Sequence, residues 1–216
     1  MAFAYVQSAY HSSNSATSSP VTLTGVTVGN ILVSFFYSRD TPNVTGNPAD
    51  SQGFTHVVSG GGWSVAWGYY KVATATSESA TYTLSNPKRV RSCLVEYSYD
   101  TAKTLVLETD THLGGNPMDD TADLITTTNS TCLVVSGVGY WGGASMTDAN
   151  GGTRRTNQND SNASFAFGDR MPGATGDYGF DWQQSGTTGL QFAFSEQAAG
   201  ASGKPWYQRA QQRVVA

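Results

Sequence analysis

Short apolar runs, separated by clusters of turn-forming residues, recur along almost the whole chain of 216 residues. The clearest run covers residues 31–37, which are almost all apolar, and the charged pair Arg39-Asp40 follows it. Such a run is long enough for a β-strand but far shorter than the roughly 18 apolar residues that a membrane helix needs. Runs and turns at these short intervals are typical of an all-β sandwich or barrel.

The composition agrees with this fold class. Only 13% of the residues are charged, whereas Gly, Ser, Thr and Asn are plentiful. Helical proteins usually carry more Glu, Lys, Leu and Ala. The net charge of -4 is mild and argues against nucleic-acid binding. The N-terminus lacks the basic-then-apolar layout of a signal peptide, so we expect neither export by such a signal nor a membrane partner.

The pattern predicts one domain over residues 1–195, without a helix and without an internal repeat. We expect turns at residues 41–43, 85–88 and 150–152, and an irregular loop over residues 142–162. The runs that begin at Ile31 and Cys132 are apolar on both faces and are predicted to be central strands. In residues 190–195, Phe192 and its apolar neighbours should face the core, and the alternate residues should face water. Strands are predicted over residues 3–10, 20–28, 31–37, 54–59, 63–73, 80–84, 89–98, 104–110, 131–141, 163–170, 177–182 and 190–195.

The end of the chain, residues 196–216, reads as a small-residue linker followed by a short basic arm. From Gly200 onward the chain has three basic residues and no acidic one. Pro205 suits the first turn of a helix, and Trp206, Ala210 and Val214 would then share one face. The segment is either a docking arm or a frayed tail. In the docking interpretation, the residues that contact the partner are Lys204, Trp206, Tyr207, Arg209 and Arg213.

Few residues suggest chemistry. The three histidines stand in unrelated contexts, and the sequence has no nucleophile elbow, phosphate-binding loop or Cys-x-x-Cys motif. We therefore expect no catalytic residues, no cofactor and no metal. The best local constellation is Glu108, Asp110 and His112, which would share one face of a regular strand. It could form a metal or acid–base site, but we favour a solvated strand face, because alternation alone produces this pattern.

Acidic and cysteine residues leave two further alternatives open. Asp119, Asp120 and Asp123 form one acidic patch, and the Gly-rich span from Asp169 to Asp181 forms another. Either could hold calcium if backbone carbonyls converge there, although no loop has EF-hand spacing. Cys93 and Cys132 lie in two strand-like runs and could form a disulfide. We favour two buried thiols, because free cysteine is often buried and no export signal is present.

Aromatic residues cluster in two places, Trp63 to Tyr70 and Tyr140-Trp141. A sugar-binding platform would need such rings exposed and coplanar, whereas a sandwich core uses them as filling. We favour the core.

Several stretches together resemble a known family of β-sandwich modules, found in tailed-phage virion proteins and in some bacterial surface proteins. The resemblance covers roughly residues 20–195 and follows, in order, "GVTVGNILVSFFYS", "DSQGFTHV", "VAWGYYKVATATSESATYTL", "SCLVEYS" and "TTNSTCLVVSGVGYW". These are strand and turn elements, so the family supplies no active site. The resemblance implies a structural or adhesive role on a virion surface, after assembly in the host cytoplasm.

The chain is short and stands alone, which favours a capsid decoration (cement) protein that binds the major capsid protein or other virion proteins. We expect an all-β, jelly-roll-like antiparallel sandwich of eight to ten strands with a short C-terminal arm. We also expect a homo-oligomer, with a trimer suggested by virion symmetry alone. Two alternatives remain: a tail- or fibre-associated or carbohydrate-binding module that recognises a host glycan, and a glycan-cleaving enzyme that uses Asp119 and Asp120.

Overall fold

The computed structural model describes residues 3–39, 44–60, 64–114, 124–140, 142, 152–159, 163–180, 182 and 187–198, with the backbone alone at 60, 109–114, 159 and 187. One short helix, α1, covers Pro48–Ser51. The strands are β1 (Ala4–Thr24), β2 (Ile31–Arg39), β3 (Val44–Gly46), β4 (Thr55–Gly60), β5 (Ser64–Val72), β6 (Ser77–Ser98), β7 (Thr104–Gly114), β8 (Ile125–Thr127), β9 (Cys132–Tyr140), β10 (Thr153–Asn159), β11 (Ser164–Arg170), β12 (Gly176–Tyr178) and β13 (Thr187–Gln197).

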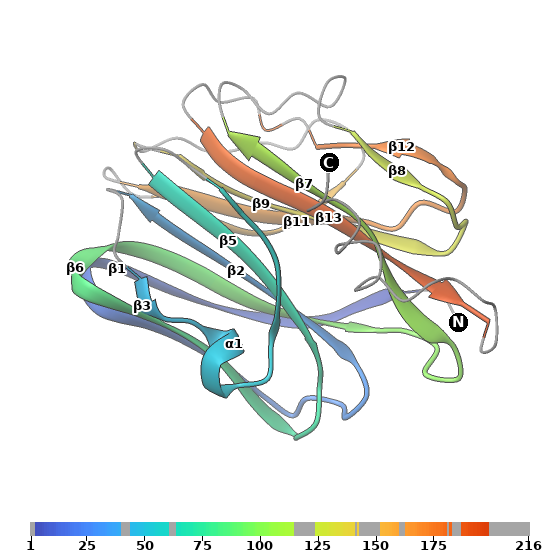
Figure 1. Ribbon diagram of the computed structural model, residues 1–216, viewed down its shortest axis with the longest axis horizontal. Helices are drawn as coiled ribbons and strands as arrows, with labels where there is room; N and C mark the ends of the chain where they lie inside the picture. Colours follow the sequence, from blue (N-terminus) through green and yellow to red (C-terminus); the bar gives the residue numbers. More distant parts are fainter. Residues whose placement is uncertain are drawn as a thin grey trace, which may run out of the picture.

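Two antiparallel sheets face each other (Figure 1). The first has the order β1-β6-β2-β5-β4, with β3 beside β6, and the second has the order β10-β11-β9-β13-β7. A small pair, β12-β8, forms a separate two-stranded sheet. The all-β antiparallel sandwich is therefore confirmed. Each large sheet comes from one half of the chain, and the jelly-roll-like detail of the prediction is not confirmed.

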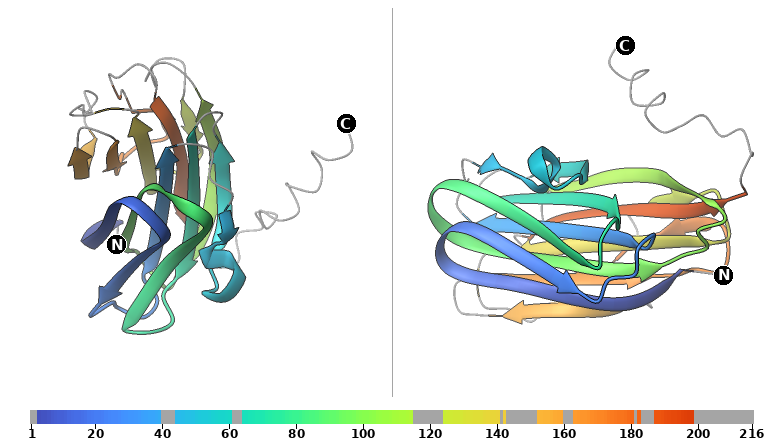
Figure 2. Two further views of the ribbon diagram at one scale, coloured as in Figure 1. Left: turned by 90° about the vertical axis from the view of Figure 1, so that its left-hand side faces the viewer. Right: turned by 90° about the horizontal axis from the view of Figure 1, so that it is seen from below.

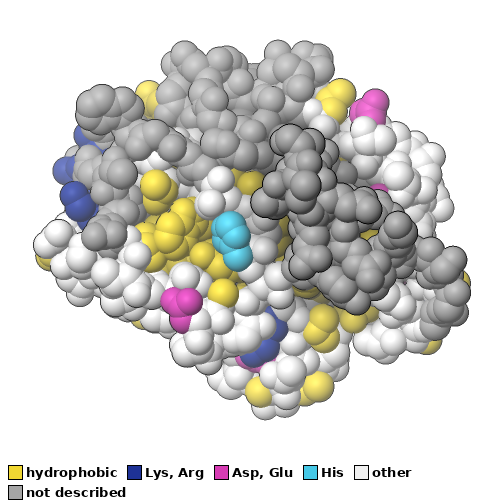
Figure 3. Space-filling model, in the orientation of Figure 1, with side chains coloured by type: hydrophobic (Ala, Val, Ile, Leu, Met, Phe, Trp, Pro, Cys, Tyr) yellow, Lys and Arg dark blue, Asp and Glu magenta, His cyan; other side chains and the backbone are white. Residues whose placement is uncertain are grey.

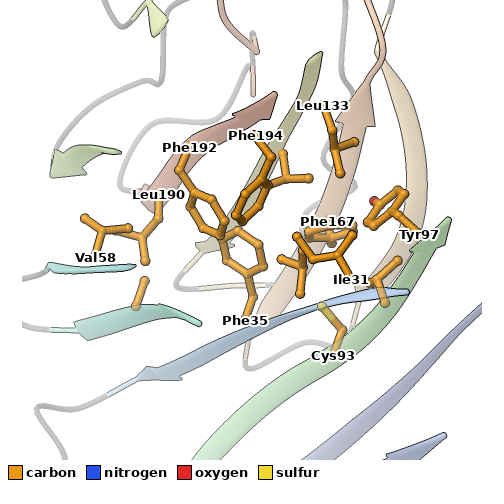
Figure 4. Packing of buried hydrophobic residues seen from close by; sticks show 14 of the residues in the cluster. Ile31, Phe35, Val58, Cys93, Tyr97, Leu133, Phe167, Leu190, Phe192 and Phe194 are labelled. Carbon is orange, nitrogen blue, oxygen red and sulfur yellow. The ribbon is translucent and has the colours of Figure 1, made fainter. Parts of the chain in front are cut away.

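The main core fills the space between the two sheets. Phe35 of β2 lies with its ring centroid 5.0 Å from that of Phe167 and 5.3 Å from that of Phe192 (Figure 4). Ile31 and Cys93 of the first sheet belong to the same buried cluster. Aromatic rings supply large buried area in such a core, so the runs from Ile31 and Cys132 hold the two sheets together.

The outer faces of both sheets are also covered. β1 and β6 bend round at one end (Figure 2), and Val21 and Tyr82 pack against Leu32 and Phe36 on the outer face of the first sheet. On the outer face of the second sheet, Trp182 belongs to a third buried cluster with residues of β8, β9, β11 and β13. Strands buried on both faces read as continuous apolar runs. β2 and β9 are the middle strands of their sheets, as predicted.

This third cluster corrects the prediction for β13. Leu190, Phe192 and Phe194 face the main core as expected. Gln191, Ala193 and Ser195, which we expected to face water, are instead fully buried. The alternation was predicted correctly, but the layer that covers the other face comes from segments distant in sequence. β13 also continues to Gln197, two residues beyond the predicted end of the domain.

Several predicted boundaries are wrong. Residues 85–88, predicted as a turn, lie within β6. β1 pairs with β6 both before and after this stretch. The chain bulges there instead: Ala16 pairs with Lys88, and Ser18 then pairs with Thr83. Such a bulge accommodates a proline that a regular strand would exclude. The predicted irregular loop over 142–162 contains β10, and the short strands β3 and β8 were not predicted.

The prediction of no helix is also wrong, by one turn. Asn47 caps α1 by accepting a hydrogen bond from the Ala49 amide, and Asp50 accepts one from the Asn47 amide. With Pro48 in the first turn, this capping box was visible in the sequence. Within the described part of the chain, no helix is long and apolar enough to cross a membrane.

Candidate functional site

The predicted docking arm and several other candidate residues lie outside the described residues. These are Lys204, Trp206, Tyr207, Arg209 and Arg213 of the arm, the acidic residues Asp119, Asp120, Asp123 and Asp181, and the aromatic residues Trp63 and Trp141. The other candidates lie on described strands and can be placed with their neighbours.

Asp169, predicted as part of an acidic patch, is buried and links the two sheets through hydrogen bonds. We call this set of contacts the Asp169 tie. The Asp169 carboxylate accepts hydrogen bonds from Arg155 Nε at 2.6 Å and Nη2 at 3.0 Å. It also accepts one from the hydroxyl of Tyr97, across the core, at 2.7 Å. The Arg155 guanidinium lies 4.1 Å from the ring centroid of Tyr5. A bidentate charged pair of this kind orients both partners, so Asp169 fixes β10 and β11 against β1 and β6.

The charges of this tie perturb their neighbours. Burial, and then the negative charge of Asp169, raise the pKa of Tyr97 well above its ordinary value. Burial alone would lower the pKa of Arg155, but its hydrogen bonds to Asp169 outweigh this and raise it. The Asp169 carboxylate is therefore engaged with a cation and a hydroxyl. Asp177, from the same predicted patch, is exposed on β12 and accepts a hydrogen bond from Thr126.

Glu108, Asp110 and His112 do not follow a simple alternation. In the pairing of β7 with β13, Thr109 lies opposite Ala193 and Leu107 opposite Phe194, which leaves Glu108 as a bulge. The bulge breaks the shared face that regular spacing predicts. Glu108 Oε2 accepts hydrogen bonds from the amide and the hydroxyl of Thr128. Within the described part of the chain, no three His, Cys, Asp or Glu residues lie close enough to hold a metal ion.

Three buried glutamates, Glu78, Glu96 and Glu196, each hold a turn in place through several hydrogen bonds. Glu96 accepts hydrogen bonds from the Thr27 amide and from the side chains of Gln7 and Asn30. These contacts secure the turn between β1 and β2. Backbone hydrogen bonds join this turn to the turn between β5 and β6, where the Gly29 amide donates to the Ala73 carbonyl.

The other two glutamates act in the same way. Glu78 accepts hydrogen bonds from the amides of Thr74 and Ala75 and forms an ion pair with Lys71 at 2.7 Å. Burial alone would raise the pKa of Glu78, but these donors outweigh it and lower the pKa. Glu196 binds the amide of Asp100 and the ammonium group of Lys103. Fully hydrogen-bonded carboxylates of this kind rigidify their surroundings.

The described aromatic residues are mostly core. Tyr69 is buried, whereas Trp67 is partly exposed. The two rings stand at 63° to each other and are not coplanar. Figure 3 shows hydrophobic side chains beside a histidine over this part of the first sheet. Tyr69 therefore lies in the core, as we favoured, whereas Trp67 is only partly buried against the same cluster.

Cys93 and Cys132 are both buried free thiols, in line with the interpretation that we favoured. Cys93 points into the main core, and burial raises its pKa. Cys132 lies at the start of β9, and burial raises its pKa too.

The edge of β1 is an uncharged surface of the first sheet. β1 is an edge strand of the first sheet, and residues 4–17 contain no fully buried residue. Val6 is 44% exposed and Tyr10 is 58% exposed. No Asp, Glu, Lys or Arg occurs in residues 1–38. This absence of charge was visible in the sequence, but that the strand forms an edge was not.

Comparison of the chain with protein-family models, with curated proteins and with solved structures found no match.

Proposed function

We propose that this chain is a non-enzymatic structural protein of a tailed-phage virion, and that it decorates and stabilises the assembled capsid. The observation that supports the structural, non-enzymatic part of the proposal is the use made of the buried charged groups. Asp169, Glu78, Glu96 and Glu196 each hold turns or sheets in place through several hydrogen bonds. Together with cores on both faces of each sheet, they make a rigid body that can present a surface.

The virion assignment rests on the resemblance over residues 20–195, whose strand and turn elements lie mostly within β2, β5, β6 and β9. A decoration protein binds the assembled lattice and not the free subunits, so its binding stabilises the shell. On a symmetric particle many copies act together, and each needs only a modest interface. The chain would be a homo-oligomer on the virion surface.

The docking element of this proposal is the C-terminal arm. Lys204, Arg209 and Arg213 supply positive charge, and Trp206 and Tyr207 supply apolar surface. The rest of the chain carries an excess of acidic residues, whereas the arm is basic. Because its charge is positive, the arm is suited to an acidic groove on a neighbouring virion protein.

The test is binding of the purified chain to empty, expanded heads. We expect saturable binding at a fixed copy number, and much weaker binding after deletion of residues 204–216. A Lys88→Gln variant, which removes a partly exposed positive charge outside the arm, is the control and should bind normally. Undiminished affinity of the deletion variant would remove the arm from the proposal. Heads that bind no protein at all would refute the decoration role.

The alternative is recognition of a host glycan by a tail- or fibre-associated module. A glycan array distinguishes the two, because binding that is lost on changing Trp63 or Trp141 to Ala would support the alternative. A sugar-binding platform needs coplanar rings, and the rings of Trp67 and Tyr69 in β5 stand at 63° to each other. These two residues therefore do not support the alternative.

A further inference from the structure

The free edge of β1 carries an inference that is independent of any role on a virion. In the two large sheets, as far as the described residues go, the strand order ends at β1, β4, β7 and β10. β4 has six residues, and β10 carries Arg154 and Arg155 with a register shift between Arg154 and Thr156. β7 contains Glu108 and its bulge. Short length, charge and bulges are the devices that keep sheet edges from pairing with other chains.

β1 lacks these devices over residues 7–13. It has a bulge at Val6 and further register shifts after Ser13. Between them, residues from Gln7 to Ser13 pair with Glu96 to Val90 of β6 without a shift. This stretch has no charged residue beyond the histidine at position 11. One side of it is paired with β6, and no described strand pairs with the other side.

The stretch is also self-complementary. Tyr10 stands at its centre and is its most exposed large side chain. Ser8 and Ser12 flank Tyr10 at equal distances along the sequence. In an antiparallel pairing about a two-fold axis at Tyr10, the two Tyr10 side chains lie beside each other. Ser8 of each copy then lies opposite Ser12 of the other.

These contacts suit a second copy of the same strand. Aromatic pairs and hydroxyl pairs directly across an antiparallel ladder are stabilising, and no like charges meet. A two-fold contact uses the same patch on both subunits and closes on itself, so it does not propagate into a filament.

We propose that two copies of this chain pair edge to edge through residues 7–13 of β1, antiparallel and centred on Tyr10, so that their first sheets form one continuous sheet. The occupant of the free edge is a second copy and not an unrelated peptide, because the alternate residues Ser8, Tyr10 and Ser12 read the same in both directions. The contact makes a dimer the elementary unit, in place of the trimer that virion symmetry suggested.

The experiment is sedimentation velocity of the full chain over a range of concentrations. We expect a reversible dimer in the unaltered protein. In Ser8→Lys/Ser12→Lys, a lysine of each copy lies opposite a lysine of the other, and the dissociation constant of the dimer should rise roughly tenfold or more. In Ser8→Lys/Ser12→Glu, each lysine lies opposite a glutamate, and the dimer should be restored. This pair of variants tests the register as well as the surface.

Two further variants separate the contact from general effects. Tyr10→Lys places two charges at the axis and should also dissociate the dimer, while Tyr10 is exposed enough for the fold to tolerate it. Val28→Lys changes another exposed apolar residue, 57% exposed and outside β1, and should leave the dimer intact. Circular dichroism checks the fold of each variant.

A protein that stays monomeric at its highest soluble concentration would overturn the proposal. So would a trimer, or equal dimer stability in the Lys/Lys and Lys/Glu variants. None of these results bears on binding to heads, so the failure of this inference and the failure of the proposed function are distinguishable.

Discussion

Single glycines in β9 set how closely the two sheets can approach. Gly137 lies against the ring of Phe35, and Gly139 lies against the ring of Tyr37, so that an added Cβ at either position would overlap the ring. Both rings belong to the buried core, where neighbours cannot move freely. The close approach, and not backbone conformation, is what requires glycine at these two positions.

We therefore expect Gly139→Ala to lower the free energy of unfolding by about 1–3 kcal/mol, the usual cost of overpacking a core. Urea denaturation followed by fluorescence measures this change. Gly173→Ala is the matched control, because an added Cβ there meets no atom within 4 Å. Equal stability of the two variants would show that the sheets do not approach each other as closely as described.

His11 should make the stability depend on pH. Burial, and then the charge of Arg91, lower the pKa of His11 below 6.5, and its Nε2 has no hydrogen-bond partner among the described residues. Between the lowered pKa and 6.5, the unfolded chain binds more protons than the folded one. His11 therefore destabilises the fold as the pH falls below 6.5, and has no such effect above it.

The measurement is the urea midpoint at about pH 8 and about pH 5. In His11→Gln the difference between the two midpoints should shrink, whereas in His56→Gln, which changes an exposed histidine, it should stay near that of the unaltered protein. A pH dependence that is the same in all three proteins would assign the acid sensitivity to other groups. Glu78, with its lowered pKa, loses its contribution only at lower pH.

At the scale of elements, Asp169 links β11 to Tyr97 of β6 through a buried hydrogen bond. Asp169→Asn keeps the size of the side chain but leaves Arg155 without its counter-charge. Removing one partner of a buried pair costs about 3 kcal/mol or more, and we expect a loss of that order in urea denaturation. Asp177→Asn removes an exposed carboxylate that accepts one hydrogen bond from Thr126 and should cost much less. A similar loss of stability in Asp169→Asn and Asp177→Asn would contradict the structural role given to Asp169.

The strands that could be predicted are those whose continuous apolar sequence indicates burial on both faces. β2 and β9 are apolar on both faces and were placed correctly at the centres of their sheets. β3 and β8 have three residues each, too few for a periodic signal. β10, with the sequence TRRTNQN, is polar on both faces, so nothing in its composition distinguishes it from a loop.

The buried polar ties could not be predicted from local sequence at all. Glu196 binds Asp100, 96 residues away, and Tyr97 binds Asp169, 72 residues away. Nothing near Glu196 or Asp169 indicates these partners, because the topology alone brings them together. For the same reason, the acidic patch from Asp169 to Asp181 suggested calcium, while the fold pairs Asp169 with Arg155.

At the scale of the whole molecule, the two thiols report on unfolding. Cys93 and Cys132 are buried, and burial raises the pKa of both. Because the thiolate is the reactive form, an aromatic disulfide reagent should label neither cysteine in the native protein. It should label both in denaturant, and only one in Cys132→Ser. Rapid labelling of the native protein would contradict the burial, and absence of labelling in denaturant would indicate a disulfide.

The division of the sheets between the two halves of the chain sets the order of events during synthesis. The first sheet is complete once Ser98 has left the ribosome, but its inner face, with Ile31, Phe35 and Val95, then has no cover. β7 is the first strand of the second sheet to be made, yet among the described strands it pairs with β13 alone, the last of them. The second sheet therefore cannot close until β13 has been translated. Between these two moments the nascent chain exposes an apolar surface that favours aggregation, and slower translation prolongs that exposure.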